Sequence, residues 1–306
     1  MARMSDKKVV FTLAYYHQIP FAVMLMHYTK KHNPEVETQI WLVDTPQEEA
    51  ERLIRQQAFP YDFRSIEEIY PSIDLEQKAS RFTQKEWKEN SKPAVFKKLL
   101  ETFDLVLYAD NKSVIFSNLT DIFIGIGSND VLLVPELMYA DGHKAQENTL
   151  NRGIYSNHFI LAQQTETVYA FLDWWEREVE EKGVIDVCKG YNADRYFLEI
   201  APSIFPHFVI YKHPGVGICK ENEVERKVEW DIKVVNAYPL VNYTFTSIAD
   251  YPAGLEPVVP KKIRKEFEKI KPILGKYEVE LPDWKKRVIR FLQGIIASIH
   301  RLFDLF

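Results

Sequence analysis

The chain has 306 residues, 46% hydrophobic and 27% charged, which is the composition of an ordinary folded protein with one large domain or two small ones. Its two cysteines, Cys188 and Cys219, are not in Cys-x-x-Cys spacing, which favours a reducing compartment. The sequence has no apolar run of about 18 residues and no signal-like N-terminus, so we expect a cytoplasmic protein without a membrane-spanning helix.

Charge is distributed unevenly along the chain. Residues 261–306 carry 12 Lys and Arg against 6 Asp and Glu, a net charge of +6, whereas the other 260 residues carry 27 against 38, a net charge of −11. A basic tail on an acidic body predicts that the tail meets an anionic partner. The body has no basic stripe with interleaved aromatic residues, so we expect no nucleic-acid partner.

The first half of the chain alternates between apolar runs of strand length and helical patterns. Pro20 fits the first turn of a helix. Strands separated by helices of about 12 residues predict a mostly parallel sheet, in which ligands bind beyond the carboxyl ends of the strands. The expected strands are 8–14, 38–43, 61–63 and 104–109, and the expected helices begin at Pro20 and cover 45–57 and 92–103.

The pattern of the second half predicts a mixture of helices and strands that complete the sheet and line its site. The 165–181 helix carries Trp174 and Trp175, a pair that most often packs in a core. The last element, 284–306, has one apolar face and a basic opposite face, so it either docks on the body or lies on an anionic membrane surface. The strands expected here are 131–135, 159–162, 208–211, 228–235 and 241–245, and the helices are 165–181 and 192–200.

Asp110 is the first candidate for a functional residue. It follows a buried-type strand and precedes Asn111 and Lys112. A carboxylate at the end of a buried strand costs several kcal/mol unless it is paired or holds a cation. Residues 110 and 112 project to the same side of an extended chain, so Lys112 is the nearest candidate partner.

Motifs between residues 9 and 247 resemble, in order and spacing, the GT-A-fold glycosyltransferases that use nucleotide sugars, in particular bacterial transferases with a Trp-Trp helix. In that family a strand ends in Tyr-Leu-Asp-Ala-Asp, whose Asp-x-Asp holds a divalent cation against the donor's diphosphate. The matching segments are Val9–Thr12, Lys92-Pro93, Leu107–Lys112, Gly153–Phe159, Phe171–Trp175, Asp194-Arg195, Pro214-Gly215, Asn222–Arg226 and Tyr243–Thr246.

The resemblance implies one large α/β GT-A domain with a mostly parallel central sheet over residues 1–250. Its nucleotide-binding half would cover about 1–125 and its sugar and acceptor half about 126–250, followed by a basic helical extension over 251–306. It also implies transfer of a sugar from a nucleotide sugar, expected to be UDP-linked, to a glycan or lipid-linked acceptor. The protein would then work in the cytoplasm, either free or peripheral on the inner face of the membrane.

The sequence departs from the family at polar positions. Lys112 replaces the second Asp of Asp-x-Asp, Arg195 replaces a Gln, and His158 replaces a Gly. The incomplete motif argues against an Mn²⁺ or Mg²⁺ cofactor, because Asp110 is the one motif carboxylate left to hold it.

Two interpretations follow from these departures. One is a metal-independent transferase, in which Lys112 and Arg195 supply the positive charge for the phosphates. The other is a catalytically inactive fold that binds a nucleotide sugar or glycan, or scaffolds an active transferase.

The resemblance also implies roles for individual residues. Asp194, Lys112 and Arg195 are the expected catalytic residues, and Asp194 would lie on the sugar side. The expected nucleotide-binding residues are Thr12, Leu13, Ala14, Tyr16, Asp110, Asn111 and Lys112. The expected sugar- or acceptor-binding residues are Tyr155, Ser156, Asn157, His158 and Asp194.

Overall fold

The computed structural model describes residues 6–55, 61–70, 75, 78, 80–139, 153–186 and 189–246. The chain forms two compact units divided between Glu266 and Phe267, and the described residues all lie in the first. The predicted domain boundary near residue 250 and the predicted helix at 284–306 fall outside the described residues, so both stay predictions.

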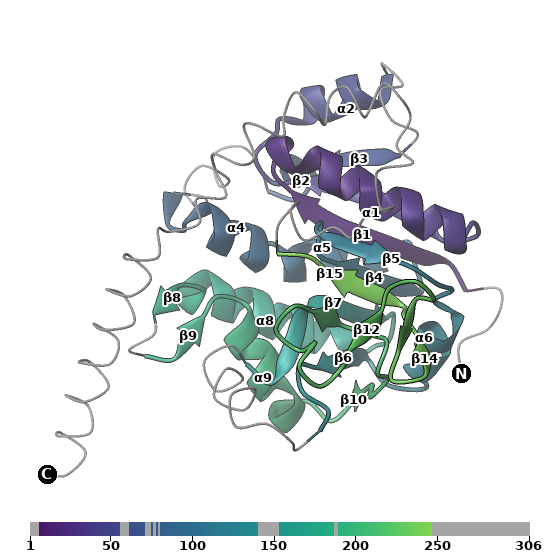
Figure 1. The fold of residues 1–306 in the computed structure, drawn as a ribbon. Coiled ribbons are helices and arrows are strands. Elements are labelled where there is room, and N and C mark those ends of the chain that lie inside the picture. The colour runs from purple at the N-terminus through teal and green to yellow at the C-terminus, as the bar shows by residue number, and fades with distance from the viewer. Residues whose placement is uncertain are drawn as a thin grey trace, which may run out of the picture. The chain divides into compact units, whose positions relative to one another are not determined.

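A seven-stranded sheet forms the centre of the first unit, in the order β10-β6-β7-β4-β1-β2-β3 (Figure 1). Six strands run in one direction, and β7 is antiparallel to both of its neighbours. The predicted fold class, α/β with a mostly parallel central sheet, is therefore confirmed. The strands are β1 Lys8–Ala14, β2 Glu37–Leu42, β3 Asp62–Ser65, β4 Leu105–Ala109, β6 Val131–Pro135, β7 Tyr155–Gln163 and β10 Phe208–Ile210.

Helices cover both faces of this sheet, and the two resulting layers are its hydrophobic cores. Because side chains alternate along a strand, Val10 and Ala14 of β1 enter one core and Phe11 and Leu13 enter the other. The first core is closed by α1 Ile19–His32, α2 Gln47–Arg55 and α6 Thr120–Gly125. The second is closed by α4 Gln84–Asn90, α5 Lys92–Leu100, α8 Val168–Lys182 and α9 Arg195–Ile204.

Smaller sheets lie beside the central one. In the first, β5 pairs antiparallel with β15, which places Ser113 opposite Thr244. In the second, the segment predicted as one strand over 228–235 is instead two antiparallel strands, and Lys233 between them adopts a positive φ of 55°. The members are β5 Ser113–Ile115, β11 Ile218–Cys219 and β15 Asn242–Thr244; β12 Val228–Glu229, β13 Val234–Val235 and β14 Tyr238–Pro239; and β8 Ile185–Asp186 with β9 Tyr191–Asn192.

Two differences from the predicted elements bear on the site. Strand β7 begins at Tyr155, four residues before the predicted start, because Tyr155 pairs with Pro135 across an irregularity in β6. His158 therefore lies within a strand. Helix α4 was not predicted from the sequence; its first turn is fixed by a capping box between Thr83 and Glu86.

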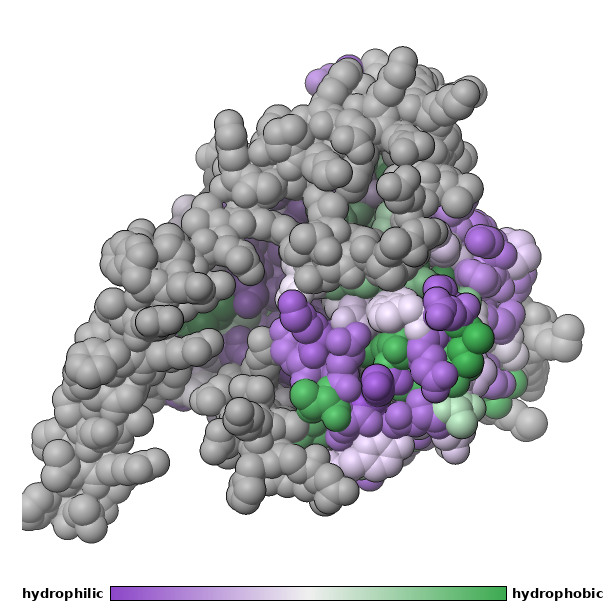
Figure 2. All heavy atoms as spheres, viewed as in Figure 1, coloured by the Kyte–Doolittle hydropathy of each residue, from purple (hydrophilic) through white to green (hydrophobic). Residues whose placement is uncertain are grey.

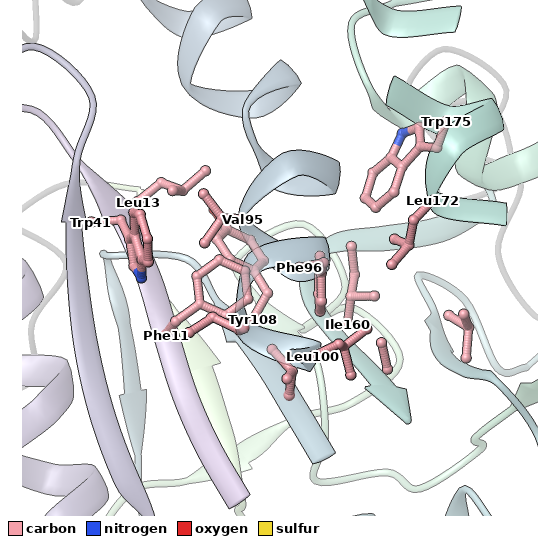
Figure 3. Close-up of a cluster of buried hydrophobic side chains, with 14 of the residues drawn as sticks. Phe11, Leu13, Trp41, Val95, Phe96, Leu100, Tyr108, Ile160, Leu172 and Trp175 are labelled. Carbon is pink, nitrogen blue, oxygen red and sulfur yellow. The ribbon is translucent and has the colours of Figure 1, made fainter. Parts of the chain in front are cut away.

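Aromatic and aliphatic side chains together fill the core between the sheet and helices α5 and α8, as Figure 3 shows. The Phe11 ring meets Phe96 edge-on with centroids 4.9 Å apart. Trp175 has no exposed surface and stacks on Phe171 at 5.4 Å. The predicted core role of Trp175 is confirmed, and Trp174 is partly buried against the same cluster.

The described surface carries no broad apolar area on the face seen in Figure 2, where hydrophilic and hydrophobic residues are interspersed. Among the described residues, no helix combines the length and apolar character needed to cross a membrane.

We expect Trp175→Ala to lower the free energy of unfolding by about 3 to 5 kcal/mol, because it opens a cavity between α8 and the sheet. Urea unfolding followed by circular dichroism measures the change. Trp174→Ala is the matched control and should cost clearly less, since Trp174 keeps part of its surface in water. Equal losses for the two variants would contradict the packing described above.

Candidate functional site

Asp110 lies at the carboxyl end of β4 with 5% of its surface exposed. Its Oδ2 accepts a hydrogen bond from the Lys88 ammonium at 2.9 Å, and its Oδ1 accepts the backbone N–H of Lys112 at 3.0 Å. The prediction that Asp110 would have a partner is correct, but the ion pair described here is with Lys88 of α4. Lys112 contributes its N–H, and its ammonium donates to the Thr246 carbonyl at 2.9 Å.

Helices α4 and α5 place three charged residues near Asp110. Lys88 and Lys92 are four residues apart, and Glu89 lies three residues before Lys92, so the three share one helical face. The connection is almost continuously helical, because Ser91 has helical backbone angles and its hydroxyl donates to the Trp87 carbonyl at 2.8 Å. Trp87 Nε1 donates to the Val43 carbonyl at 3.0 Å and so ties α4 to the end of β2.

Lys92 connects α4 and α5 to β7 and to the residue that precedes α9. Its ammonium has no exposed surface and contacts Glu89 Oε2, Asp194 Oδ2 at 2.8 Å and the Asn157 carbonyl at 2.9 Å. Asn157 Nδ2 in turn donates to Asp194 Oδ1 at 3.1 Å. We call Lys88, Glu89, Lys92, Asp110 and Asp194 the buried charge cluster.

The buried charge cluster holds three carboxylates and two ammoniums. Burial opposes ionisation of all three acids, but Lys92 and Lys88 outweigh it at Glu89 and lower the pKa of that residue to about 2. At Asp110, Lys88 likewise overcomes burial and holds the pKa well below its usual range. At Asp194, burial dominates over Lys92 and raises the pKa to about 6. Two ammoniums balance two carboxylates, so the third acid retains its proton most readily.

His158 of β7 lies beside this cluster and is half-buried. Its carbonyl accepts the Asp110 N–H at 2.9 Å. Burial lowers the pKa of the imidazole, against the opposite effect of Asp110, Glu89 and Glu136. The ring is therefore neutral at pH 7 and can accept a proton.

Arg195 forms a separate ion pair. Its Nη2 is 2.5 Å from Glu136 Oε1, and the residue is 8% exposed. Gly153 adopts a φ of +111°, and a Cβ at that position would come within 2.6 Å of Arg195 Nε, so glycine is needed for this packing. The predicted phosphate-binding charge of Arg195 is thus directed at an internal carboxylate.

Several predicted nucleotide-binding residues are inside the protein. The side chains of Thr12, Leu13 and Ala14 have no exposed surface, because β1 is a central strand covered on both faces. Asn111 is also fully buried, and its Nδ2 donates to Gln18 Oε1 at 2.8 Å. These four side chains are therefore inside the protein, and their assignment to the nucleotide stays a prediction. Tyr16, by contrast, is 41% exposed.

Among the remaining predicted sugar-binding residues, some side chains are buried and others keep exposed surface. Tyr155 is half-buried at the start of β7. Ser156 is 3% exposed, and its hydroxyl accepts the His158 N–H at 3.3 Å. Asn157 is held by the buried charge cluster. The structure therefore brings Asp110, Asn157, His158 and Asp194 together, as the sequence predicts, but buries Asp194 completely.

A pocket of about 320 Å³ opens beyond the carboxyl ends of β1 and β2. Asp44 lies in its wall, where Oδ1 accepts the Tyr16 N–H at 2.8 Å. His17 interacts electrostatically with both Asp44 and Lys112, so both charged side chains lie near its ring. The lining includes Tyr15, Val43, Asp44, Thr45, Phe82 and Trp87.

Sequence reasoning missed Lys88, Glu89 and the partners of Lys92. The i, i+3 and i+4 spacing of their charges was visible, but the same spacing occurs on solvated helices. No cluster of three or more His, Cys, Asp or Glu with metal-binding geometry occurs among the described residues.

No family model and no curated protein matches the chain. The glycosyltransferase GlyE of Streptococcus pneumoniae TIGR4 is similar in structure, with 17% identity, a TM-score of 0.49 and 95% of this chain covered. This chain spans only 64% of that GlyE structure. The galactosyltransferase LgtC, in complex with donor and acceptor sugar analogs, has 12% identity and a TM-score of 0.48 over 91% of this chain and 99% of its own.

Mouse xyloside xylosyltransferase 1 in its apo form has 11% identity and a TM-score of 0.45, over 81% of this chain and 100% of its own. The three structures are named as glycosyltransferases. With TM-scores below 0.5, these similarities carry no weight for function, which has to be argued from the residues of this chain.

The raised pKa of Asp194 predicts a pH dependence of stability. Between about pH 4 and 6 the unfolded chain has released this proton while the folded protein keeps it, so the contribution of Asp194 to the free energy of unfolding falls as pH rises. The slope is at most about 1.4 kcal/mol per pH unit. Asp194→Asn should remove this slope in urea unfolding measured from pH 4.5 to 7.

Asp173→Asn is the control for this measurement, because its side chain is 60% exposed on α8. It should leave the pH dependence unchanged. A wild-type slope that persists in Asp194→Asn would show that another group titrates in this window.

Proposed function

We propose that the protein is a glycosyltransferase that binds a nucleotide-sugar donor, UDP-linked by the sequence resemblance, and transfers the sugar without a divalent metal to a glycan or lipid-linked acceptor. The observation that carries this proposal is the buried charge cluster at the carboxyl end of β4. Five charges with little or no exposure cost more than apolar residues would, and such groups concentrate at functional sites. The carboxyl ends of parallel strands are also where α/β proteins bind ligands.

The donor is assigned to the pocket and to Lys112. A volume of about 320 Å³ suits a nucleoside, and the Asp44 carboxylate can accept a base N–H. From there the diphosphate runs past His17 to Lys112. The Lys112 ammonium then stabilises the negative charge that builds on the leaving diphosphate when the bond to the sugar breaks.

His158 is assigned to the acceptor. Its half-buried neutral ring can take the proton of the acceptor hydroxyl as the new glycosidic bond forms. Asp194 is assigned a positioning role, because its buried carboxylate holds Asn157 and Lys92 and has no surface with which to touch a sugar. Arg195 positions Glu136 in the same internal way.

The second candidate function is binding without transfer, by an inactive member of the same fold class. The burial of Asp194 and the ion pair of Arg195 with Glu136 favour it, because two of the predicted catalytic groups are satisfied internally. Donor binding is common to transfer and to binding of a nucleotide sugar without transfer, whereas binding of a glycan or of an active transferase needs no donor. Release of UDP from a UDP-sugar, with or without an acceptor, separates them.

UDP or a UDP-sugar at 100 times its Kd should raise the melting temperature by about 5 to 10 °C, equally in EDTA and in Mn²⁺. Lys112→Met should weaken binding about tenfold or more, since it removes one charge-assisted hydrogen bond. Lys98→Met, on an exposed lysine paired with Glu101, is the control and should bind as wild type does. Absence of any shift from a panel of nucleotides and nucleotide sugars would reject transfer and nucleotide-sugar binding.

We also propose that residues 284–306 form a basic amphipathic helix that attaches the protein to an anionic membrane surface. Its support is the net charge of +6 over 261–306. The full chain should co-sediment with vesicles containing phosphatidylserine, and Lys285→Glu/Lys286→Glu/Arg290→Glu should not. Neutral phosphatidylcholine vesicles are the control, and equal sedimentation of the two proteins would contradict the proposal.

A further inference from the structure

Asp110 stands where the resemblance places the first carboxylate of a metal-binding Asp-x-Asp, so the fit of its surroundings to a divalent ion can be tested. Mg²⁺ and Mn²⁺ are held by oxygen ligands, usually with more than one from the protein. Asp110 Oδ2 faces the Lys88 ammonium at 2.9 Å, and Oδ1 accepts the Lys112 N–H at 3.0 Å. The second motif position carries an ammonium in place of a carboxylate. These residues do not fit a divalent metal.

We propose that the Lys88 ammonium is the built-in cation of the Asp110 site and occupies the place at which a divalent ion would otherwise bind. The assignment differs from the sequence prediction, which gave this role to Lys112. It concerns cation binding alone, so it stands whether or not the protein transfers a sugar.

The position of Lys88 is fixed from several sides. Helix α4 is anchored at its start by the Thr83–Glu86 capping box and at its end by Asn90 Nδ2, which donates to the Gly183 carbonyl at 2.7 Å. The Lys88 side chain is 10% exposed and lies between two carboxylates, Asp110 at 2.9 Å and Glu89 at 3.4 Å. A cation bound at Asp110 would have to displace this ammonium or approach it closely.

The electrostatics agree with this geometry. Burial disfavours the charged form of Lys88, but Asp110 and Glu89 outweigh burial and raise its pKa above the ordinary value. The ammonium is therefore charged across the physiological range. Asp110 is correspondingly ionised, and the pair is neutral without an ion from solution.

The proposal makes a prediction about restoring the motif. Lys112→Asp recreates Asp-x-Asp, yet it should still bind Mn²⁺ weakly, because Lys88 continues to occupy Asp110. Lys88→Met/Lys112→Asp should bind Mn²⁺ at least tenfold more tightly than Lys112→Asp. The readout is the electron paramagnetic resonance signal of free Mn²⁺ during titration of each full-length protein, without any nucleotide.

Lys98→Met/Lys112→Asp is the matched control, since it also removes one lysine charge but at an exposed position where the lysine pairs with Glu101. It should bind Mn²⁺ no better than Lys112→Asp. If Lys88→Met/Lys112→Asp does not unfold cooperatively, Lys88→Gln/Lys112→Asp, which keeps a hydrogen-bond donor toward Asp110, gives the same comparison.

Three results would overturn the proposal: tight Mn²⁺ binding by the wild type, equal binding by Lys112→Asp and the folded double variant, or an equal gain in the Lys98 control. Because the titration contains no nucleotide, its outcome is independent of the melting experiment with UDP. A protein that fails to bind UDP but shows the Mn²⁺ pattern would retain Lys88 as its cation and lose the proposed function.

Discussion

The candidate site depends on the contacts made by the Lys92 ammonium. An ammonium has three N–H donors, and here they meet Glu89, the Asn157 carbonyl and Asp194. These partners come from α4, from β7 and from the residue that precedes α9, so one buried cation connects the two halves of the sheet. Because Lys92 has no exposed surface, loss of Glu89 would leave a buried charge uncompensated, and loss of another partner would leave a buried N–H donor unpaired.

Most of the charged groups around Lys92 are neutralised by one another. Lys88 neutralises Asp110, Lys92 neutralises Glu89, and the third acid, Asp194, is left with a pKa raised to about 6. Below about pH 6, where Asp194 keeps its proton, the cluster is therefore neutral without an ion from solution. This pairing of charges explains why the Asp194 carboxylate accepts hydrogen bonds from Lys92 and Asn157 and is not exposed to a ligand.

The strands of the sheet could be predicted well from the sequence, because the spacing of hydrophobic residues directly indicates which positions are buried. Strands β1, β4 and β6 follow apolar runs, and the unpredicted α4 is polar in sequence although Trp87, Lys88 and Glu89 are buried in it. Burial of a charged helix depends on long-range partners such as Asp110, which no local pattern contains. For the same reason the burial of Thr12 and Asn111 could not be predicted, because their exposure is set by neighbours distant in sequence.

The division between buried and exposed polar residues decides where any chemistry can occur. Asp194, Arg195 and Asn157 are bound internally, whereas Tyr16 and His158 keep exposed surface and Lys112 keeps part of its own. Asp110 is neutralised by Lys88, and Lys112, like Asp44 of the pocket wall, acts electrostatically on His17. In the proposed function, the diphosphate is therefore recognised at the rim, beside Lys112, and not by the buried side chains.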